Sequence, residues 1–345
     1  MIRKNQHFCS ILPPHMLLEM ARHGSPKQKA TALSTLVQTE QFRGNRIGAG
    51  ALAFLAPVVI PGEKRAVYDA RHTSFLPGKL MRQEGSAKAN DVSVNDAYDG
   101  AGAYYDFFKK VYQRDSLDDQ GFPLNSTVHY GRNYDNAFWN GRQMVYGDGD
   151  GDLFGSFTKA LDVIGHELTH GIVQFEANLI YEGEAGALNE SFADVFGSLV
   201  KQYKNNQKAR DADWLIGAGL LTSKVHGRGL RSMKAPGTAY DDPVLGKDPQ
   251  PAHMKNYVKT QDDNGGVHIN SGIPNRAFYE AAIRIGGHAW EKTGLIWYQT
   301  LKDRLKFDSD FSAAARLTAT VTGELFGNTS SERKAVLEAW KAVGL

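Results

Sequence analysis

The chain has 345 residues, of which 41% are hydrophobic and 23% charged, and 40 Lys and Arg against 38 Asp and Glu leave a net charge of +2. This balance argues against a dedicated nucleic-acid binder, and no run approaches the ~18 apolar residues of a membrane span. The length exceeds the usual single-domain size, which predicts two lobes. The single cysteine, Cys9, excludes an intramolecular disulfide.

The first fifty residues differ in character from the rest. Helical patterns cover residues 15–22 and 28–42, and a Gly-rich, basic stretch at residues 43–50 follows them as a linker would. We expect residues 1–50 to form a detachable propeptide that ends in this linker. No secretory signal with an apolar core is recognisable at the N-terminus.

The remainder changes from strand signals to helical signals. Strands and turns dominate residues 51–155, apart from one helical stretch at residues 91–114, and from residue 158 the apolar spacing is helical. We therefore expect an α+β, two-lobed fold. Its strand-rich N-terminal lobe covers residues 51–180, its mainly helical C-terminal lobe covers residues 181–345, and one motif-bearing helix lies between them.

That helix carries His166-Glu167-Leu168-Thr169-His170. Residues four apart on an α-helix differ by about 40° in direction, so His166 and His170 present two imidazoles to one metal ion. Glu167 lies about a quarter turn away and can reach a metal-bound water as a general base. For this composition roughly 0.014 chance matches are expected, so the pattern predicts a catalytic zinc site.

A catalytic zinc typically takes a third protein ligand. The candidates are Glu176, Glu182, Glu184 and Glu190. Glu176 points about 280° around the same helix and is disfavoured. Glu190 is preferred because we expect it to begin a second amphipathic helix, on which Asp194 follows one turn later. Asp194 is then either a hydrogen-bond partner for a ligand histidine or a solvated helix charge.

Several segments together resemble the thermolysin family of zinc endopeptidases. They are residues 166–170, 186–194, 136–141, 144–151, 230–233 and 263–272. The resemblance covers about residues 60–345. The short N-terminal segment, with Pro13-Pro14-His15-Met16-Leu17, is similar to that of the protealysin subgroup.

The resemblance implies roles for the residues around the motif. His166, His170 and Glu190 are the implied zinc ligands, Glu167 is the implied base, and Asp194 orients His166. Zinc polarises the scissile carbonyl and lowers the pKa of water, while the base moves a proton to the leaving amine.

Other implied roles concern the substrate. Tyr181 and His268 donate hydrogen bonds to the oxyanion, Asp263 orients His268, and Arg231 holds a substrate carbonyl. Taken alone, His268 is more often a surface or core histidine and Tyr181 a core side chain; Asp263 and the Gly-Gly turn before His268 reverse this for His268.

Substrate contacts complete the implied site. An edge strand at Asn136 and Ala137 pairs with the peptide backbone. A pocket for a bulky apolar residue after the cut is lined by Phe154, Phe157, Val163, Ile216, Leu220 and Leu230. A pocket without polar partners disfavours charged side chains.

Departures from the family concern calcium. Asp162 and Asp213 remain from the carboxylates of the family's double calcium site, but Lys201 and Ala218 stand at the positions aligned to two others. Arg228 stands where another calcium loop of the family has an aspartate. Zn²⁺ is therefore the expected cofactor, with at most one weak calcium site near Asp162 and Asp213.

These observations predict a self-processing zymogen of a zinc endopeptidase that cleaves before bulky hydrophobic residues. The expected partners are protein or peptide substrates and the chain's own propeptide as an inhibitor. A zinc aminopeptidase and a catalytically silent binding protein are the alternatives. We expect secretion without a recognisable signal peptide, with a cytoplasmic location as the alternative.

Cys9 has two interpretations. Its thiolate can occupy the fourth zinc position as a switch, because sulfur is a good zinc ligand. The other interpretation, which the frequent burial of free cysteine favours, is a small side chain that packs beside Pro13-Pro14.

Overall fold

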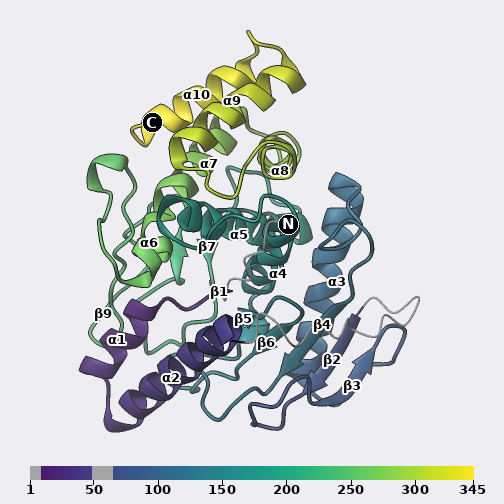
Figure 1. The fold of residues 1–345 in the computed structure, drawn as a ribbon, viewed down its shortest axis with the longest axis vertical. Coiled ribbons are helices and arrows are strands. Elements are labelled where there is room, and N and C mark those ends of the chain that lie inside the picture. The colour runs from purple at the N-terminus through teal and green to yellow at the C-terminus, as the bar shows by residue number, and fades with distance from the viewer. Residues whose placement is uncertain (1–8, 49–64) are drawn as a thin grey trace.

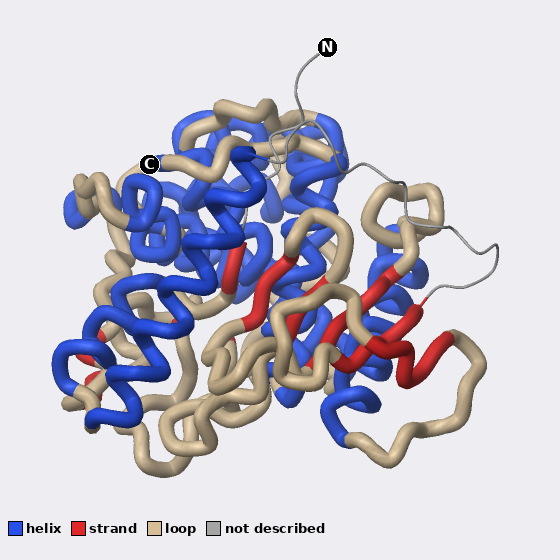
Figure 2. Tube along the Cα trace, turned by 60° about the horizontal axis from the view of Figure 1, so that its bottom comes forward, coloured by secondary structure: helices blue, strands red, loops and turns tan. Residues whose placement is uncertain are grey.

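The computed structural model describes residues 9–48 and 65–345 (Figure 1). Its main sheet has the strand order β1-β5-β6-β4-β2-β3, and Figure 2 shows these strands side by side. Strands β2, β4 and β6 run parallel, and the other pairings are antiparallel. The strand bounds are β1 Cys9–Ser10, β2 Arg65–Asp69, β3 Lys79–Gln83, β4 Leu124–Val128, β5 Ala137–Trp139 and β6 Met144–Tyr146. Helix α3, Val92–Tyr112, lies where the helical pattern at residues 91–114 predicts a helix. It packs on β2 and β4.

Two long helices lie at the centre of the molecule (Figure 1). Helix α4 spans Leu161–Phe175 and helix α5 spans Gly183–Lys204. The expectation that Glu190 begins the second helix is wrong, because α5 starts seven residues earlier. Its first turns contain Ala185, Gly186 and Ala187, which are too small to give an apolar periodicity although they are buried.

The C-terminal lobe is mainly helical, which confirms the predicted α+β, two-lobed architecture. Its elements are β7 Leu215–Ile216, β8 Arg231–Ser232, β9 Asp241–Asp242, β10 Gly246–Lys247, α6 Asp263–Asn270, α7 Gly272–Ile285, α8 Thr293–Asp303, α9 Phe311–Phe326 and α10 Ser331–Ala342. Two short 3₁₀ turns, η1 Phe157–Lys159 and η2 Met254–Asn256, complete the described chain.

The N-terminal segment forms β1 and two helices, α1 Pro14–His23 and α2 Pro26–Gly48. Helix α2 continues through Gly48, although the glycines at 44 and 48 predict a linker from residue 43. The helical backbone conformation is open to glycine as to other residues, at a propensity cost of about 1 kcal/mol each. Residues 49 and 50 of the expected linker lie outside the described residues.

Glycines bring α4 and α5 into close contact. A Cβ atom added at Gly197 would lie 2.4 Å from the backbone carbonyl oxygen of Asp162 and 2.9 Å from the backbone nitrogen of His166. A Cβ atom at Gly165 would lie 2.9 Å from the Gly197 Cα. The two backbones therefore touch at His166 itself and in the turn before it, and this contact sets the spacing of the side chains that both helices send into the site.

A buried ion pair also joins these helices. The Lys201 ammonium donates to Asp162 Oδ2 at 2.8 Å, to Asp213 Oδ1 at 2.9 Å and to the Leu215 carbonyl at 2.7 Å. A protein cation thus lies between the two carboxylates that the sequence offers as a weak calcium site.

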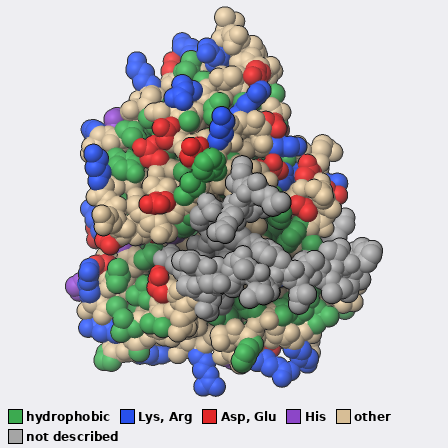
Figure 3. Space-filling model, viewed as in Figure 1, with side chains coloured by type: hydrophobic (Ala, Val, Ile, Leu, Met, Phe, Trp, Pro, Cys, Tyr) green, Lys and Arg blue, Asp and Glu red, His purple; other side chains and the backbone are tan. Residues whose placement is uncertain are grey.

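The surface carries charges of both signs. On the face shown in Figure 3, Lys and Arg side chains are interspersed with Asp and Glu. Within residues 9–48 and 65–345, no helix is both long and apolar enough to cross a membrane.

We predict that Gly197→Ala lowers the free energy of unfolding by about 1–3 kcal/mol, because overpacking forces the two helix backbones apart. The variant should also bind zinc less well. Gly102→Ala in α3 is the control, since its added methyl meets only the flexible Arg65 side chain. Urea unfolding and metal analysis measure both effects, and equal behaviour of the two variants would show that the α4–α5 contact is not limiting.

Candidate active site

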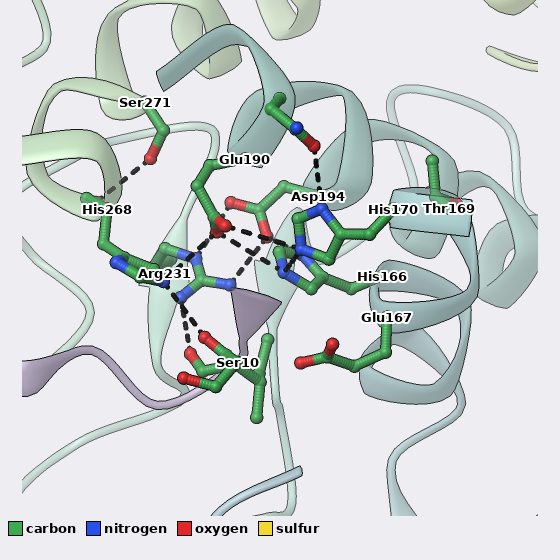
Figure 4. A network of polar contacts seen from close by, with 12 residues as sticks. Ser10, His166, Glu167, Thr169, His170, Glu190, Asp194, Arg231, His268 and Ser271 are labelled. Carbon is green, nitrogen blue, oxygen red and sulfur yellow. Dashed lines mark hydrogen bonds and ion pairs between the residues drawn. The ribbon is translucent and has the colours of Figure 1, made fainter. Parts of the chain in front are cut away.

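The site is built from the facing sides of α4 and α5 (Figure 4). Helix α4 contributes His166, Glu167 and His170, and helix α5 contributes Glu190 and Asp194. All five side chains are at most 2% exposed. The (i, i+4) spacing places both imidazoles on the same face of α4, as the sequence predicts.

The two histidines are oriented by acceptors on α5. His166 Nδ1 donates to Asp194 Oδ1 at 2.8 Å, and His170 Nδ1 donates to Asn189 Oδ1 at 2.8 Å. Each Nδ1 therefore carries a hydrogen, which leaves lone pairs on the two Nε2 atoms. These Nε2 atoms lie 3.1 Å apart. Two lone pairs at this distance repel, and a metal ion bound by both nitrogens relieves the repulsion.

Glu190 completes a triangle of donor atoms. Its Oε2 lies 3.4 Å from His166 Nε2, and its Oε1 lies 3.4 Å from His170 Nε2. Tetrahedral zinc with bonds of about 2.0–2.2 Å separates its ligand atoms by roughly 3.3–3.5 Å. Glu190 Oε2 is buried with no hydrogen-bond partner among the described residues. Donor types, spacing and this buried oxygen fit a zinc ion.

Asp194 connects the metal-ligating side to the substrate side. It accepts two hydrogen bonds from Arg231, at 2.9 and 2.8 Å, and one from Asn275 Nδ2 at 2.8 Å. Burial opposes its charge, but Arg231 and His166 hold the pKa of Asp194 at about 2. Asp194 is thus a buried, ionised carboxylate that orients His166, and it is not a solvated helix charge.

Glu167 points toward the same space from the other side of His166 (Figure 4). Its Oε2 accepts from the Trp139 backbone nitrogen at 2.9 Å, and its Oε1 has no hydrogen-bond partner within the described chain. Burial, with the nearby charge of Glu190, raises the pKa of Glu167 well above its ordinary value. A fixed carboxylate with a raised pKa is suited to accept a proton near neutral pH.

His268 and Tyr181 approach from the C-terminal lobe. His268 Nδ1 donates to Asp263 Oδ1 at 2.7 Å, and the Tyr181 hydroxyl donates to Glu190 and lies 3.2 Å from His268 Nε2. Although burial acts against it, the charges of Asp263 and Glu190 raise the pKa of His268. Left-handed backbone at residues 263–266 turns Asp263 back toward this ring.

Strand β1 lies directly in front of these groups. His268 Nε2 donates to the Ser10 carbonyl at 3.0 Å, and Arg231 Nη1 donates to the Ile11 carbonyl at 3.0 Å. The Ile11 nitrogen donates to the Ala137 carbonyl at 3.1 Å. Two of the implied substrate donors therefore hold consecutive carbonyl groups of the chain's own N-terminal segment.

Asn136 binds the next residue of this segment. Its Oδ1 accepts from the Leu12 nitrogen at 2.9 Å, and its Nδ2 donates to the Leu12 carbonyl at 3.3 Å. Asn136 precedes β5, and β1 pairs with β5 through Cys9↔Trp139 and Ser10↔Phe138. In the intact chain the N-terminal segment pairs with this edge of β5, and the expected pairing of Asn136 and Ala137 with a substrate backbone stays a prediction.

The six implied pocket residues are all buried, at most 2% exposed, in one apolar cluster. Backbone bonds tie their segments together: the Leu230 nitrogen donates to the Ile216 carbonyl, and the Gly155 nitrogen donates to the Leu220 carbonyl, both at 2.8 Å. The pocket remains a prediction. Its expected lining offers no charged side chain and consists of Phe154, Phe157, Val163, Ile216, Leu220 and Leu230.

Sequence reasoning missed two residues and one backbone group. Asn189 orients His170, Asn275 binds Asp194, and the Trp139 amide anchors Glu167. Asn189 directly precedes Glu190, so its place one residue before a ligand was an available signal. The other two lie 81 and 28 residues from the groups they bind, and local patterns give no signal for them.

This fold and donor set define a metallopeptidase. The family model described as the thermolysin metallopeptidase catalytic domain matches residues 61–174, and the model for its alpha-helical domain matches residues 177–345. The chain belongs to the thermolysin family of metalloendopeptidases, within its protealysin-like group. Enzymes of this family use zinc.

The similar proteins extend over nearly the whole chain. It is 51% identical to an extracellular metalloprotease of Pectobacterium carotovorum subsp. carotovorum, over 99% of this chain and 98% of that protein. It is 46% identical to the protease PrtS of Photorhabdus sp., over 99% and 93%. The precursor of protealysin from Serratia proteamaculans matches with a TM-score of 0.88 and 53% identity, covering 97% of this chain and 99% of that one.

We predict that Glu167→Ala retains zinc and fold but loses peptide hydrolysis by at least about 10²–10⁴-fold, because it removes a proton carrier and no ligand. His170→Ala should lose zinc as well. Metal analysis and a peptide assay on both variants separate the two roles. Near-normal turnover by the Glu167 variant, with contaminating protease excluded, would refute its role as base.

Proposed function

We propose that this chain is the zymogen of a zinc-dependent endopeptidase, held inactive by its own N-terminal segment. One observation carries the proposal: the groups implied to bind a substrate backbone bind residues 10–12 instead. Ser10 meets His268, Ile11 meets Arg231 and Ala137, and Leu12 meets Asn136. The segment thus occupies the cleft as an extended peptide would.

After the segment leaves, the same residues have substrate roles. His166, His170 and Glu190 hold zinc, which when bound supplies a Lewis acid for the scissile carbonyl and lowers the pKa of water. Glu167 accepts a proton on its unpartnered Oε1 and returns it to the leaving amine. His268 and Tyr181 donate to the developing oxyanion, and Arg231 holds the next carbonyl.

The expected domain boundaries follow from this assignment. Residues 1–50 are the propeptide, residues 51–180 the N-terminal lobe and residues 181–345 the C-terminal lobe. N-terminal sequencing after incubation, together with a casein digest, tests the function. A new N-terminus between residues 43 and 51, in parallel with digestion, is the expected result, and an intact chain that never digests casein would contradict it.

Of the alternatives, neither is favoured. A silent binding protein has no need for a buried Glu167 with a fixed orientation. A segment that runs through the cleft from Cys9 to Leu12 suits an endopeptidase better than an enzyme that must bind a free amino terminus. We propose that the active form is secreted, since the relatives named above include extracellular proteases. Calcium is not expected to bind strongly at Asp162 and Asp213, because the Lys201 ammonium contacts both carboxylates.

Substrate preference should be for a bulky apolar residue directly after the cut. The implied pocket has six apolar side chains, and Ile11 follows the carbonyl that faces His268. Burying a charged side chain there without a partner is unfavourable. A peptide library read by mass spectrometry measures the preference, and cleavage mainly before Asp, Lys or Gly would exclude this pocket.

Release of the propeptide should depend on pH through Asp135. This residue is buried beneath α2, where its nitrogen donates to Thr35 Oγ1 at 3.1 Å. Burial, with Asp150 nearby, raises the pKa of Asp135 to about 8. While the segment is docked, Asp135 therefore keeps a proton that a solvated aspartate would lose. Docking should therefore weaken as the pH rises toward about 8, because release of the segment lets water reach Asp135 and favours its charged form.

The pH dependence of release is tested by adding Asp135→Asn to the full-length Glu167→Ala chain. Both chains carry Glu167→Ala, so neither can process itself. Asn stays neutral, so its propeptide should be cut more slowly by added trypsin, and the ratio of the two rates should grow between pH 5 and pH 8. The ratio cancels the pH dependence of trypsin itself. A ratio that stays constant with pH would show that Asp135 does not titrate on release.

Cys9 belongs to the same inhibitory contact. Its side chain is 3% exposed beside Tyr181 and Val267, and its sulfur, a His170 nitrogen and a Glu190 oxygen all lie within 4.8 Å of one another. We propose that the Cys9 thiolate is the fourth zinc ligand of the precursor. It would then exclude the water on which hydrolysis depends.

Cobalt in place of zinc reports this ligand, because thiolate bound to Co²⁺ gives an intense near-ultraviolet charge-transfer band. Full-length Glu167→Ala should show the band, and the same chain with Cys9→Ser should lack it. In the active background, Cys9→Ser should process itself faster. Identical spectra and an unchanged processing rate would assign the thiol to packing, and the backbone of residues 10–12 would then block the cleft alone.

A further inference from the structure

A second group of metal-type ligands lies at one edge of the main sheet. Strands β2, β4 and β6 run parallel, so their carboxyl ends meet at the same edge. His72 follows β2 by three residues, His129 directly follows β4, and Asp148 follows β6 by two. One ligand atom from each lies within 4.8 Å of the other two. These residues are distinct from those of the catalytic site.

The distances suit a small cation with nitrogen and oxygen ligands. His72 Nδ1 lies 3.4 Å from Asp148 Oδ2, which is close to the ligand separation of roughly 3.3–3.5 Å in tetrahedral zinc sites. His129 Nδ1 lies 2.7 Å from Asp148 Oδ1, a hydrogen-bond distance. Metal binding would replace the proton in that bond and widen it by less than about 1 Å.

The framework that holds these side chains is already fixed. His129 Nε2 donates to Asp91 Oδ2 at 2.9 Å, and the other Asp91 oxygen caps α3 by accepting from the Val94 nitrogen at 3.1 Å. A carboxylate on the far nitrogen of a ligand histidine fixes the ring and increases its basicity. The His72 backbone nitrogen donates to the His129 carbonyl at 2.8 Å, which joins the backbones of the two histidines.

We propose that His72, His129 and Asp148 form a second, solvent-accessible site for a divalent transition metal such as Zn²⁺. Two imidazoles and one carboxylate favour zinc, nickel or copper over calcium. The His72 side chain is 57% exposed, which leaves the remaining coordination position to water. A bound ion would tie the ends of the three parallel strands together and restrain the turn that leads from Asp148 to the pocket residue Phe154.

Zinc stoichiometry tests the proposal in full-length Glu167→Ala chains, equilibrated with buffered low-micromolar zinc and freed of unbound metal. The parent should bind two zinc ions and His72→Ala one. His23→Ala, whose side chain is exposed to a similar extent (55%), should retain two. His170→Ala should lose the catalytic ion and keep the second one, so the two sites are counted separately.

A second readout is thermal stability. Excess zinc should raise the Tm of the His170→Ala chain, and this rise should vanish when His72→Ala is added. One ion in the parent, or two ions in both His72→Ala and His23→Ala, would overturn the proposal. Neither result would bear on the catalytic site, because peptide hydrolysis is not measured.

Discussion

The arrangement of the whole site depends on two imidazole nitrogens that face each other at 3.1 Å with their lone pairs inward. Asp194 and Asn189 accept hydrogen bonds from the far nitrogens and thereby turn both near nitrogens toward the same point. A metal ion at this point makes the geometry favourable, and Glu190 supplies a charge that balances it. The close contact of the α4 and α5 backbones sets these distances, since both helices must approach to within van der Waals range before their side chains can converge.

The same network links metal binding to substrate binding. Asp194 bonds His166 on one side and Arg231 on the other, and Arg231 also holds the Ile11 carbonyl. The N-terminal segment therefore does more than cover a hydrophobic surface. In the proposed function it uses the hydrogen-bond donors that an extended substrate needs, so inhibition and substrate recognition would be two uses of one set of groups.

Much of this could be read from the sequence where the signal is local. The His166 and His170 pair follows from helical geometry, the helical pattern at residues 91–114 predicts α3, and the family resemblance names the more distant groups. The start of α5 was misplaced because small buried residues carry no periodicity. Strand β1 was not foreseen either, because two residues give no pattern and their partners in β5 lie about 130 residues away. Long-range pairing of this kind depends on tertiary structure that one sequence does not display.

The most direct test follows peptide hydrolysis and intact mass in one sample during activation. The central claim is that residues 9–12 occupy the place of the substrate, so the account predicts no hydrolysis of a quenched peptide while every chain is intact. Activity should then rise in proportion to the chains that have lost the N-terminal segment. Hydrolysis at the final rate by a sample whose mass spectrum shows only intact chains would contradict the account.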